Sequence, residues 1–392
     1  MFSLDSVGFL ITDFNLFYVL SEIANYIYIL IILVFLTSFK LLDKDYFIFW
    51  AFYFATPLLV NYILFHPTYM GDQFQYSEAL NDFISEGYSS LSGFATRITG
   101  GQLMMASAIM SFVPMVSYLS VTSIGFINKL IALVLLLFLS RKIDQKNLMY
   151  FFIVPSFILY SSVGLRDVLI MVSITFFLFS LVERKFLTSL FFALIVLFIK
   201  IQLGLGLFIS WALMFIIRAD ISIIRLQIGA LIAVAAAIFL FDSYGELLNI
   251  YRYAFALEDC PGQYTFCTTI GPEDVRINSG IDLIWLVITS VPLFLLKPLP
   301  WEISGIFQLL TFIEVCVLYY FFYVFAIKSK LYFSNTFWIV ITSFVISTAL
   351  LAVSSFNLGT LSRYRFEMLW PYLMVIYFLY IKHESSKEPE AA

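Results

Sequence analysis

Long apolar runs separated by short polar loops constrain the fold of this chain more than any other feature of its sequence. A transmembrane helix needs about 20 predominantly apolar residues, because each adds about 1.5 Å and the hydrocarbon core is about 30 Å thick. The sequence therefore predicts an all-α, polytopic transmembrane helix bundle. The candidate runs are 17–39, 46–65, 121–140, 148–164, 167–183, 186–199, 203–217, 222–241, 281–297, 302–327, 331–353 and 366–382.

The composition agrees with a membrane protein. Of the 392 residues, 62% are hydrophobic and 12% are charged, about half the charged fraction of a typical soluble domain. The net charge of −4, without a basic patch, gives no indication of a nucleic-acid partner. The bundle is predicted to form one domain over 1–382, followed by a disordered cytoplasmic tail over 383–392. No Lys or Arg precedes the first run, so no cleavable signal peptide is expected.

Basic loops predict the orientation of the bundle, because cytoplasmic loops carry an excess of Lys and Arg. The basic positions are Lys40, Lys44, Arg141, Lys142, Lys146, Arg184, Lys185, Arg218, Arg225, Lys328, Lys330 and Lys382. With these inside, the segments predicted to lie outside are 66–120, 164–167, 200–202, 243–280 and 354–365.

This orientation sets two conditions on the apolar segments. Residues 102–118 must form an interfacial or re-entrant helix, because the chain has to cross only once between residues 66 and 140. Residues 281–297, which are short and contain Pro292, are expected to be re-entrant. About eleven of the runs then cross the membrane, and the N-terminus lies outside.

Two cysteines in the second large outer loop are candidates for a disulfide. Cys260 and Cys267 flank PGQYTF, and a Pro-Gly turn in six intervening residues is compatible with a small closed loop. The predicted outer location is oxidising, which favours the bond. Two free thiols are the alternative.

Ionisable residues near the bilayer are costly unless they are paired or hydrated, so four polar groups need an explanation. The first lies in 71–97, where Asp72 precedes Tyr76 by four residues and Arg97 closes the segment. Asp72 is a candidate general base, or a ligand that orients a sugar hydroxyl. The alternative is a solvated amphipathic helix, because the apolar residues after Asp72 recur at helical spacing.

The second group is the short connection formed by Arg166 and Asp167. With no room for a loop, Arg166 is held at the outer membrane boundary, where its guanidinium offers a rigid fork of donors for phosphate. The alternative is an Arg166–Asp167 surface pair or a snorkelling anchor.

In the third group, Lys200 and Gln202 interrupt an apolar run. They make either an anion site at the start of a helix or a plain turn between two helices.

The fourth group opens the last run, where Arg363 and Arg365 flank Tyr364. Basic residues on the outer face run against the positive-inside bias, so a bound anion is predicted to favour them there. Two guanidinium forks would neutralise a pyrophosphate and stabilise it as a leaving group. Pairing with Glu367 or with lipid headgroups is the alternative.

All four groups fall on the same predicted outer face. They indicate a site for an anionic, partly hydrophilic substrate at the membrane boundary, with an acid nearby. The sequence contains no HExxH, GxSxG or Walker motif and no cluster of Cys and His, so neither a metal nor another cofactor is expected.

Four motifs resemble those of the bacterial O-antigen polymerases of the Wzy type, which are similar in layout to the GT-C glycosyltransferases. The motifs are GDxxxY at 71–76, PxxxxxSxxxLRD at 155–167, PLPWE at 298–302 and SRYRxxxxxP at 362–371. The resemblance covers most of the chain. It implies polymerisation of lipid-linked oligosaccharide repeat units on the periplasmic face of the bacterial inner membrane, from an undecaprenyl-pyrophosphate donor.

The resemblance also implies roles for the polar residues. Arg166, Arg363 and Arg365 would bind the donor pyrophosphate, and Asp72 or Asp167 would activate or orient the acceptor hydroxyl. The implied partners are undecaprenyl-pyrophosphate-linked oligosaccharides, the bilayer and a chain-length regulator protein. The further substrate-binding residues are Tyr76, Arg97, Lys200, Trp301 and Tyr364.

Two other classes of membrane protein share parts of this pattern. A GT-C transferase that adds one sugar from a polyprenyl-phosphate donor would carry almost every feature described. A flippase for lipid-linked oligosaccharides would also have about twelve spans, but with charges deep in a central cavity and an internal repeat. The sequence indicates polar groups at one boundary and no matching halves.

Overall fold

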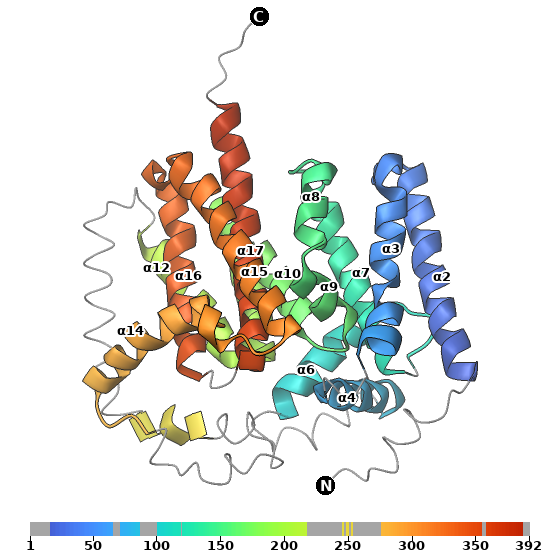
Figure 1. Ribbon diagram of the computed structural model, residues 1–392, viewed down its shortest axis with the longest axis horizontal. Helices are drawn as coiled ribbons and strands as arrows, with labels where there is room; N and C mark the ends of the chain where they lie inside the picture. The colour runs from blue at the N-terminus through green and yellow to red at the C-terminus, as the bar shows by residue number, and fades with distance from the viewer. Residues whose placement is uncertain are drawn as a thin grey trace, which may run out of the picture. The chain divides into compact units, whose positions relative to one another are not determined.

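The computed structural model describes the helical part of the chain (Figure 1). The described residues are 16–65, 71–86, 100–118, 120–217, 245–246, 248–250, 252–253, 276–354 and 358–386. Every regular element within these ranges is helical. The predicted all-α class is therefore confirmed for the described residues.

Four described helices are long and apolar enough to cross a membrane, and the bent pair α9 (Pro155–Ser162) and α10 (Asp167–Val182) would make a fifth. The four are Leu20–Ser38, Val121–Leu139, Ile306–Lys328 and Asn335–Ala352. Only 22% of Leu20–Ser38 and 17% of Ile306–Lys328 is buried inside the molecule. Such extensive exposed apolar surface is unfavourable in water, so these helices support the predicted membrane location.

The chain divides into two compact units. Unit 1 comprises Met1–Ser173 and Phe198–Lys200, and unit 2 comprises Ile174–Leu197 and Ile201–Ala392. Helix α7 (Val121–Leu139) forms the core of unit 1, and most of its residues are buried. It begins with a capping box, in which the Ser123 amide donates to Ser120 Oγ at 3.1 Å. The helices packed against it are α2 (Leu16–Ser38), α3 (Phe47–Leu59), α4 (Asp72–Glu86) and α9.

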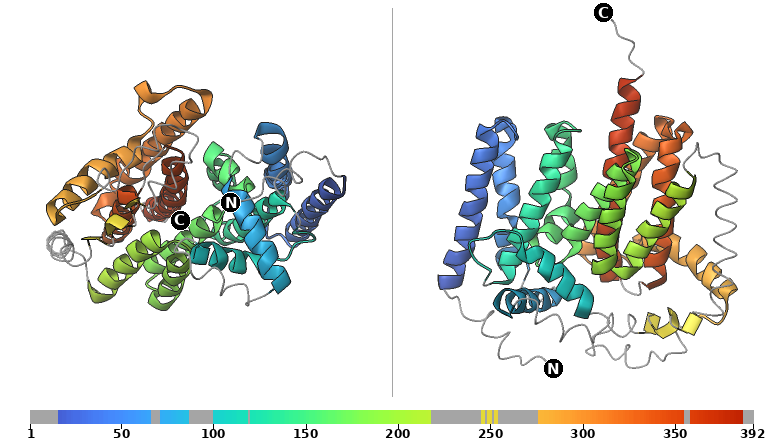
Figure 2. Two further views of the ribbon diagram at one scale, coloured as in Figure 1. Left: turned by 90° about the horizontal axis from the view of Figure 1, so that it is seen from below. Right: turned by 180° about the vertical axis from the view of Figure 1, so that it is seen from behind.

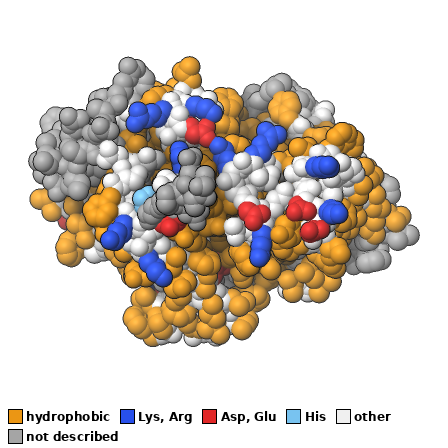
Figure 3. All heavy atoms as spheres, turned by 90° about the horizontal axis from the view of Figure 1, so that it is seen from above, with side chains coloured by type: hydrophobic (Ala, Val, Ile, Leu, Met, Phe, Trp, Pro, Cys, Tyr) orange, Lys and Arg blue, Asp and Glu red, His pale blue; other side chains and the backbone are white. Residues whose placement is uncertain are grey.

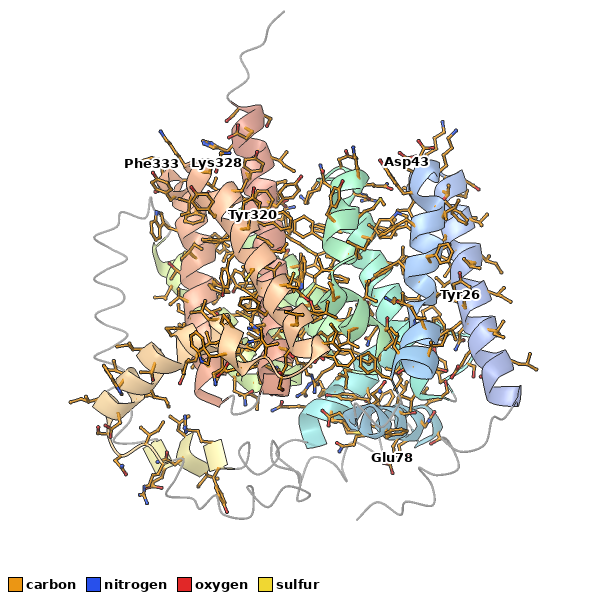
Figure 4. The ribbon with its side chains drawn as sticks, in the orientation of Figure 1. Tyr26, Asp43, Glu78, Tyr320, Lys328 and Phe333 are labelled. Carbon is orange, nitrogen blue, oxygen red and sulfur yellow. The ribbon has the colours of Figure 1, made fainter. Side chains whose placement is uncertain are left out.

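Unit 1 has a basic end and an opposite end that carries α4. At the basic end, the loops after α2 and α7 meet, because the Asp43 amide donates to Gln145 Oε1 at 3.0 Å. At the other end, α4 packs on α6 (Gly100–Ser111) and lies across the ends of the long helices (Figures 1 and 2). Figure 4 shows Asp43 and Glu78 at these opposite ends. Within unit 1, the basic loops and α4 thus lie on opposite sides, as the charge pattern predicts.

Unit 2 is built around α16 (Asn335–Ser354), which packs against α12 (Ile201–Ile217), α14 (Gly280–Leu296) and α17 (Leu358–Ser385). Helices α12 and α16 approach closely at Gly206, where a Cβ atom would lie 2.8 Å from the Cα of Ser347. Close approach through small residues is the usual packing of membrane helices, where apolar burial against other helices gives no advantage over lipid.

In unit 2, Lys382, which the charge pattern predicts to be cytoplasmic, lies far along the same helix from the predicted site residue Arg365. Arg365 and Lys382 lie in α17, which at about 1.5 Å per residue places them about 25 Å apart along its axis. Helix α15 (Ile306–Phe322) continues through η8 (Tyr323–Lys328), whose Phe325 ring contacts Tyr377 and Tyr380 in the half of α17 that carries Lys382. Figure 3 shows Lys and Arg side chains among hydrophobic ones on the face that it views.

One predicted span is broken in the structure, and two further helices correspond to the segments predicted to be interfacial or re-entrant. The prediction of one span over 148–164 is wrong, because this stretch contains α8 (Gln145–Phe152) and α9 as separate short helices. Pro155 causes the break, since it has no amide proton for a continuing helix and keeps Val154 extended. Helix α6 has 12 residues and is too short to span, as expected for an interfacial or re-entrant helix. Helix α14 runs unbroken through Pro292 for 17 residues, and its re-entrant course stays a prediction.

Candidate functional site

A break over 163–166 separates α9 from α10 and bends the chain by 117°. Its cause is local. The hydroxyls of Ser161 and Ser162 donate back to the carbonyls of Phe157 and Ile158, a contact that bends helices. Gly164 follows and lies so close to α7 that a Cβ atom would be 3.1 Å from the carbonyl oxygen of Val121. The non-helical backbone is thereby pressed against the core helix of unit 1.

Asn128 of α7 satisfies two carbonyl groups of this break. Its Nδ2 donates to the carbonyl oxygens of Val163 at 2.8 Å and of Leu165 at 2.7 Å. The side chain of Asn128 is fully buried. A buried backbone group without a partner costs about 1–3 kcal/mol, so these bonds matter for the stability of the break.

Two further carboxamides bind the same segment from other elements. Asn61 of η2 (Val60–Leu64) donates to the carbonyl oxygen of Ser162 at 3.1 Å, and the Gly164 amide donates to Gln73 Oε1 of α4 at 2.9 Å. Both side chains are buried. Asn61, Gln73 and Asn128 are called the carboxamide cradle below.

Arg166 ends the break and connects it to the end of α11 (Phe186–Ile199). Its Nη1 donates to the carbonyl oxygen of Ile199 at 2.7 Å, and the next residue, Lys200, is 3% exposed. The Nε atom of Arg166 is buried and has no hydrogen-bond partner among the described residues. The second predicted group therefore contacts the backbone next to Lys200 of the third group within unit 1. Arg166 keeps one guanidinium donor whose hydrogen-bonding capacity the described residues do not use.

Asp167 and Asp72 flank the break in different ways. Asp167 is fully buried in the first turn of α10, which rules out the alternative of an exposed surface pair with Arg166. A carboxylate at this position is favoured by the helix dipole. Asp72 is exposed in the first turn of α4, and the Gln73–Gly164 bond brings that turn to the break.

Helix α4 is the amphipathic helix considered as the alternative for this loop. Gln73, Tyr76, Leu80 and Phe83 are buried at helical spacing, while Glu78 is exposed. The amphipathic pattern is confirmed. The Tyr76 ring packs in the core of unit 1, away from the surface where a sugar would stack.

Lys129 of α7 is a candidate functional residue that the sequence analysis missed. It is fully buried, its Nζ donates to Ser161 Oγ at 2.7 Å, and the Tyr53 hydroxyl donates to the same oxygen at 3.0 Å. Among the described residues, no carboxylate forms an ion pair with Lys129. The sequence feature that could have identified it is a single lysine next to Asn128 within an otherwise apolar run. An ionisable residue within a membrane helix is costly, so it is a candidate for a functional role.

In unit 2, Arg365 binds the end of α14. Its Nη1 donates to the carbonyl oxygens of Leu295, at 3.3 Å, and of Lys297, and its side chain is 3% exposed. A cation on the terminal carbonyls stabilises a helix C-terminus through the helix dipole. Arg365 is thus engaged by the backbone of its own unit.

Arg363 and Tyr364 lie earlier in the same helix and are half-buried. Residues two apart on an α-helix do not face the same side, because each residue turns the helix by about 100°. The geometry of α17 does not favour the predicted joint binding of one pyrophosphate by Arg363 and Arg365. Arg363 is the better placed of the two for substrate.

The loop between α14 and α15 carries Trp301, which is 79% exposed. Glu302 fixes this loop: it accepts the Leu299 amide at 2.8 Å and pairs with Lys297 Nζ at 3.2 Å. The Leu299 hydrogen bond lowers the pKa of the Glu302 carboxyl, and Lys297 lowers it further. Trp301 is therefore displayed on an anchored loop, as a residue that contacts sugar or the membrane interface would be.

Three predicted residues, Arg97, Cys260 and Cys267, lie outside the described residues. Within the described ranges, no group of three or more His, Cys, Asp or Glu residues is placed to hold a metal ion. No protein-family model, curated protein or solved structure matches this chain.

Proposed function

We propose that this chain is a membrane glycosyltransferase that polymerises lipid-linked oligosaccharide repeat units of a bacterial surface polysaccharide such as O-antigen. The donor is a glycan on undecaprenyl pyrophosphate, and the acceptor is a second lipid-linked unit on the periplasmic face of the inner membrane. The observation that carries the proposal is the set of contacts at the α9–α10 break of unit 1. Arg166 donates there to the carbonyl of Ile199, the residue before Lys200, and the Gln73–Gly164 bond brings the first turn of α4, which begins at Asp72, to the same break. Cations for a pyrophosphate and a carboxylate for a hydroxyl are the groups this reaction needs.

The proposed chemistry is a single displacement at the sugar carbon that carries the pyrophosphate. The bond from this carbon to the pyrophosphate oxygen breaks, and a bond to the acceptor hydroxyl oxygen forms. Asp72, exposed at the start of α4, takes the hydroxyl proton. Undecaprenyl pyrophosphate leaves with the bonding electrons, and Arg166 and Lys200 stabilise its developing charge.

The rest of the molecule suits a substrate with a long prenyl chain. The apolar faces of Leu20–Ser38 and Ile306–Lys328 are exposed, as required for contact with lipid. Within unit 1, the loop that carries Asp43 lies at the end opposite α4 (Figure 4), and within unit 2, Lys382 lies about 25 Å from Arg365 along α17. This separation within each unit supports helices with one basic end, as membrane helices with a cytoplasmic end have. The proposed protein would have eleven to twelve transmembrane spans in a layout like that of the GT-C glycosyltransferases.

One observation favours a second candidate, a flippase for lipid-linked oligosaccharides. Such a protein is expected to carry a charge deep among its helices, and Lys129 lies fully buried in the middle of α7. A GT-C transferase that adds a single sugar shares the features of the break itself.

The test replaces Arg166 by Ala in the organism's own chromosome and analyses its lipid-linked saccharides by mass spectrometry. The matched control is Arg141→Ala, an exposed arginine at the basic end of the same unit. We expect Arg166→Ala to abolish polymer and to leave complete single repeats, both on the lipid carrier and attached to their final acceptor. The control is expected to make normal polymer.

The other outcomes overturn the proposal in distinct ways. Full-length polymer in Arg166→Ala contradicts the pyrophosphate site. A saccharide that lacks one sugar identifies a single-sugar transferase. Complete repeats that stay on the carrier and never reach the final acceptor identify a flippase.

A further inference from the structure

The α9–α10 break is bound by the side chains of three residues. Non-helical backbone at membrane depth is tolerated only where its polar groups find partners inside the protein. Here four consecutive residues, Ser162 to Leu165, each receive a hydrogen bond from the carboxamide cradle or donate one to it. The three cradle residues come from separate elements, η2, α4 and α7.

Asn128 is the central member of the cradle. Its two bonds reach the carbonyls on either side of Gly164, while Gln73 Oε1 accepts a hydrogen bond from the Gly164 amide. A further bond, from the Leu165 amide to the Val163 carbonyl at 2.9 Å, tightens the turn. Both the amide and the carbonyl groups of the backbone before Arg166 are thereby hydrogen-bonded.

Arg166 is fixed at its other end as well. Its Nη1 bond to Ile199 leaves the guanidinium plane with little freedom once the backbone is set. A guanidinium held in advance in its binding orientation loses less entropy when an anion binds, and stabilises a developing charge without rearrangement.

We infer that the carboxamide cradle, with Asn128 at its centre, is a positioning device that orients Arg166 toward the pyrophosphate of the lipid-linked donor. This inference rests on the proposed function. Asn128 is a positioning residue, since it acts through the backbone of the break and not on substrate. Its Oδ1 atom accepts no hydrogen bond from the described residues, so the two donated bonds alone account for its polar contacts.

The experiment measures lipid binding to the full chain in nanodiscs, with undecaprenyl pyrophosphate and undecaprenyl phosphate as probes. The variants are Asn128→Leu, Arg166→Ala and the double variant. Asn25→Leu is the matched control, because Asn25 is equally buried in unit 1 and its Nδ2 donates to the Ser117 carbonyl at 2.9 Å. Thermal unfolding midpoints are recorded for every variant.

We expect Asn128→Leu and Arg166→Ala each to weaken binding of undecaprenyl pyrophosphate about tenfold or more, the loss of one charge-assisted hydrogen bond. The double variant should bind no more weakly than Arg166→Ala, because both changes remove the same interaction. Affinity for undecaprenyl phosphate should change less than affinity for the pyrophosphate. Asn25→Leu should lower the unfolding midpoint as much as Asn128→Leu does, yet keep wild-type affinity.

Failure of this inference is distinguishable from failure of the proposed function. If Arg166→Ala leaves pyrophosphate binding unchanged, the proposed site itself is overturned. If Arg166→Ala weakens binding and Asn128→Leu does not, or if the two losses add, the positioning role is overturned and the site stands. If Asn128→Leu fails to fold, Gln73→Met takes its place, because it removes the acceptor for the Gly164 amide. Its binding of undecaprenyl pyrophosphate is compared with that of Arg166→Ala in the same way.

Discussion

The Nζ atom of Lys129 lies 3.7 Å from the centre of the Tyr53 ring, and both side chains bond the hydroxyl of Ser161. This contact joins α7, α3 and α9 in the core of unit 1. An amine buried among apolar helices is held by a hydroxyl and an aromatic face, two neutral partners. The contact lies one residue from Asn128, so α7 supports the end of α9 and the break that follows it through adjacent side chains.

The first prediction concerns this buried amine. In Ser161→Ala, the lysine and the tyrosine both lose their acceptor, and we expect the free energy of unfolding to fall by about 1–3 kcal/mol. Lys129→Met keeps a similar volume and removes the amine, so it should leave stability unchanged or raise it, as replacing buried charged groups often does. Tryptophan fluorescence during denaturant unfolding in detergent measures both effects.

The same variants discriminate between the two candidate functions. Combined with Lys129→Met, Ser161→Ala should cost less than it does alone by about 1 kcal/mol, the size of one hydrogen bond. An equal cost in both backgrounds would contradict the contact. If Lys129→Met still makes normal polymer, the result agrees with a polymerising glycosyltransferase. If even the final acceptor with a single repeat is lost, the result points to a flippase.

The second prediction concerns the closest approach of α7 to the break. A Cβ atom at Gly125 would lie 2.2 Å from the carbonyl oxygen of Ser162 and 3.3 Å from the Cβ of Pro57. Gly125→Ala must therefore push backbone apart, and we expect a loss of about 1–3 kcal/mol in stability. Gly101→Ala is the control: a Cβ there meets nothing within 4 Å, and its helix should gain up to about 1 kcal/mol. Equal unfolding midpoints for the two variants would refute the close packing.

The third prediction separates the two arginines of α17. Arg363→Ala should abolish polymer but still yield the final acceptor that carries a single repeat. Its unfolding midpoint should stay near that of the wild type. Arg365→Ala removes the donor to the end of α14 and should destabilise unit 2 by about 1–3 kcal/mol. Glycan gels and thermal unfolding of the same preparations measure both. Polymer of normal length in Arg363→Ala would remove that residue from the substrate site.

The fourth prediction is a pH dependence at the anchored loop. The pKa of Glu302 is lowered by the Leu299 amide, so its carboxylate stabilises the folded loop above the unfolded pKa of about 4.3. The contribution is lost as the pH falls through the lower, folded-state pKa. We expect the wild type to exceed Glu302→Gln in unfolding midpoint at neutral pH and to lose this advantage in acid. A difference in unfolding midpoint that is as large in acid as at neutral pH would show that the carboxylate is not responsible.

The sequence alone was sufficient for the class of the protein and for the local character of its helices. Apolar runs of sufficient length require helices in a membrane, because a helix satisfies its own backbone, and the described elements are all helical. Spacing within 72–86 was enough to predict the amphipathic helix α4, and charge bias was enough to place the basic loops apart from it. These are properties of neighbouring residues, which a sequence displays directly.

The tertiary structure decided which polar residues meet. Gln73 and Gly164 are 91 residues apart in the chain, and Arg365 and Lys297 are 68 apart. No periodicity encodes such bonds, because each depends on how separate helices pack. The packing of the helices directs Arg365 to the end of α14. It also buries Lys129, whose importance the surrounding apolar run of the sequence did not indicate. Long apolar runs predict a bundle of helices, and only the packing of those helices brings the arginine, the carboxylate and the carboxamides to one break.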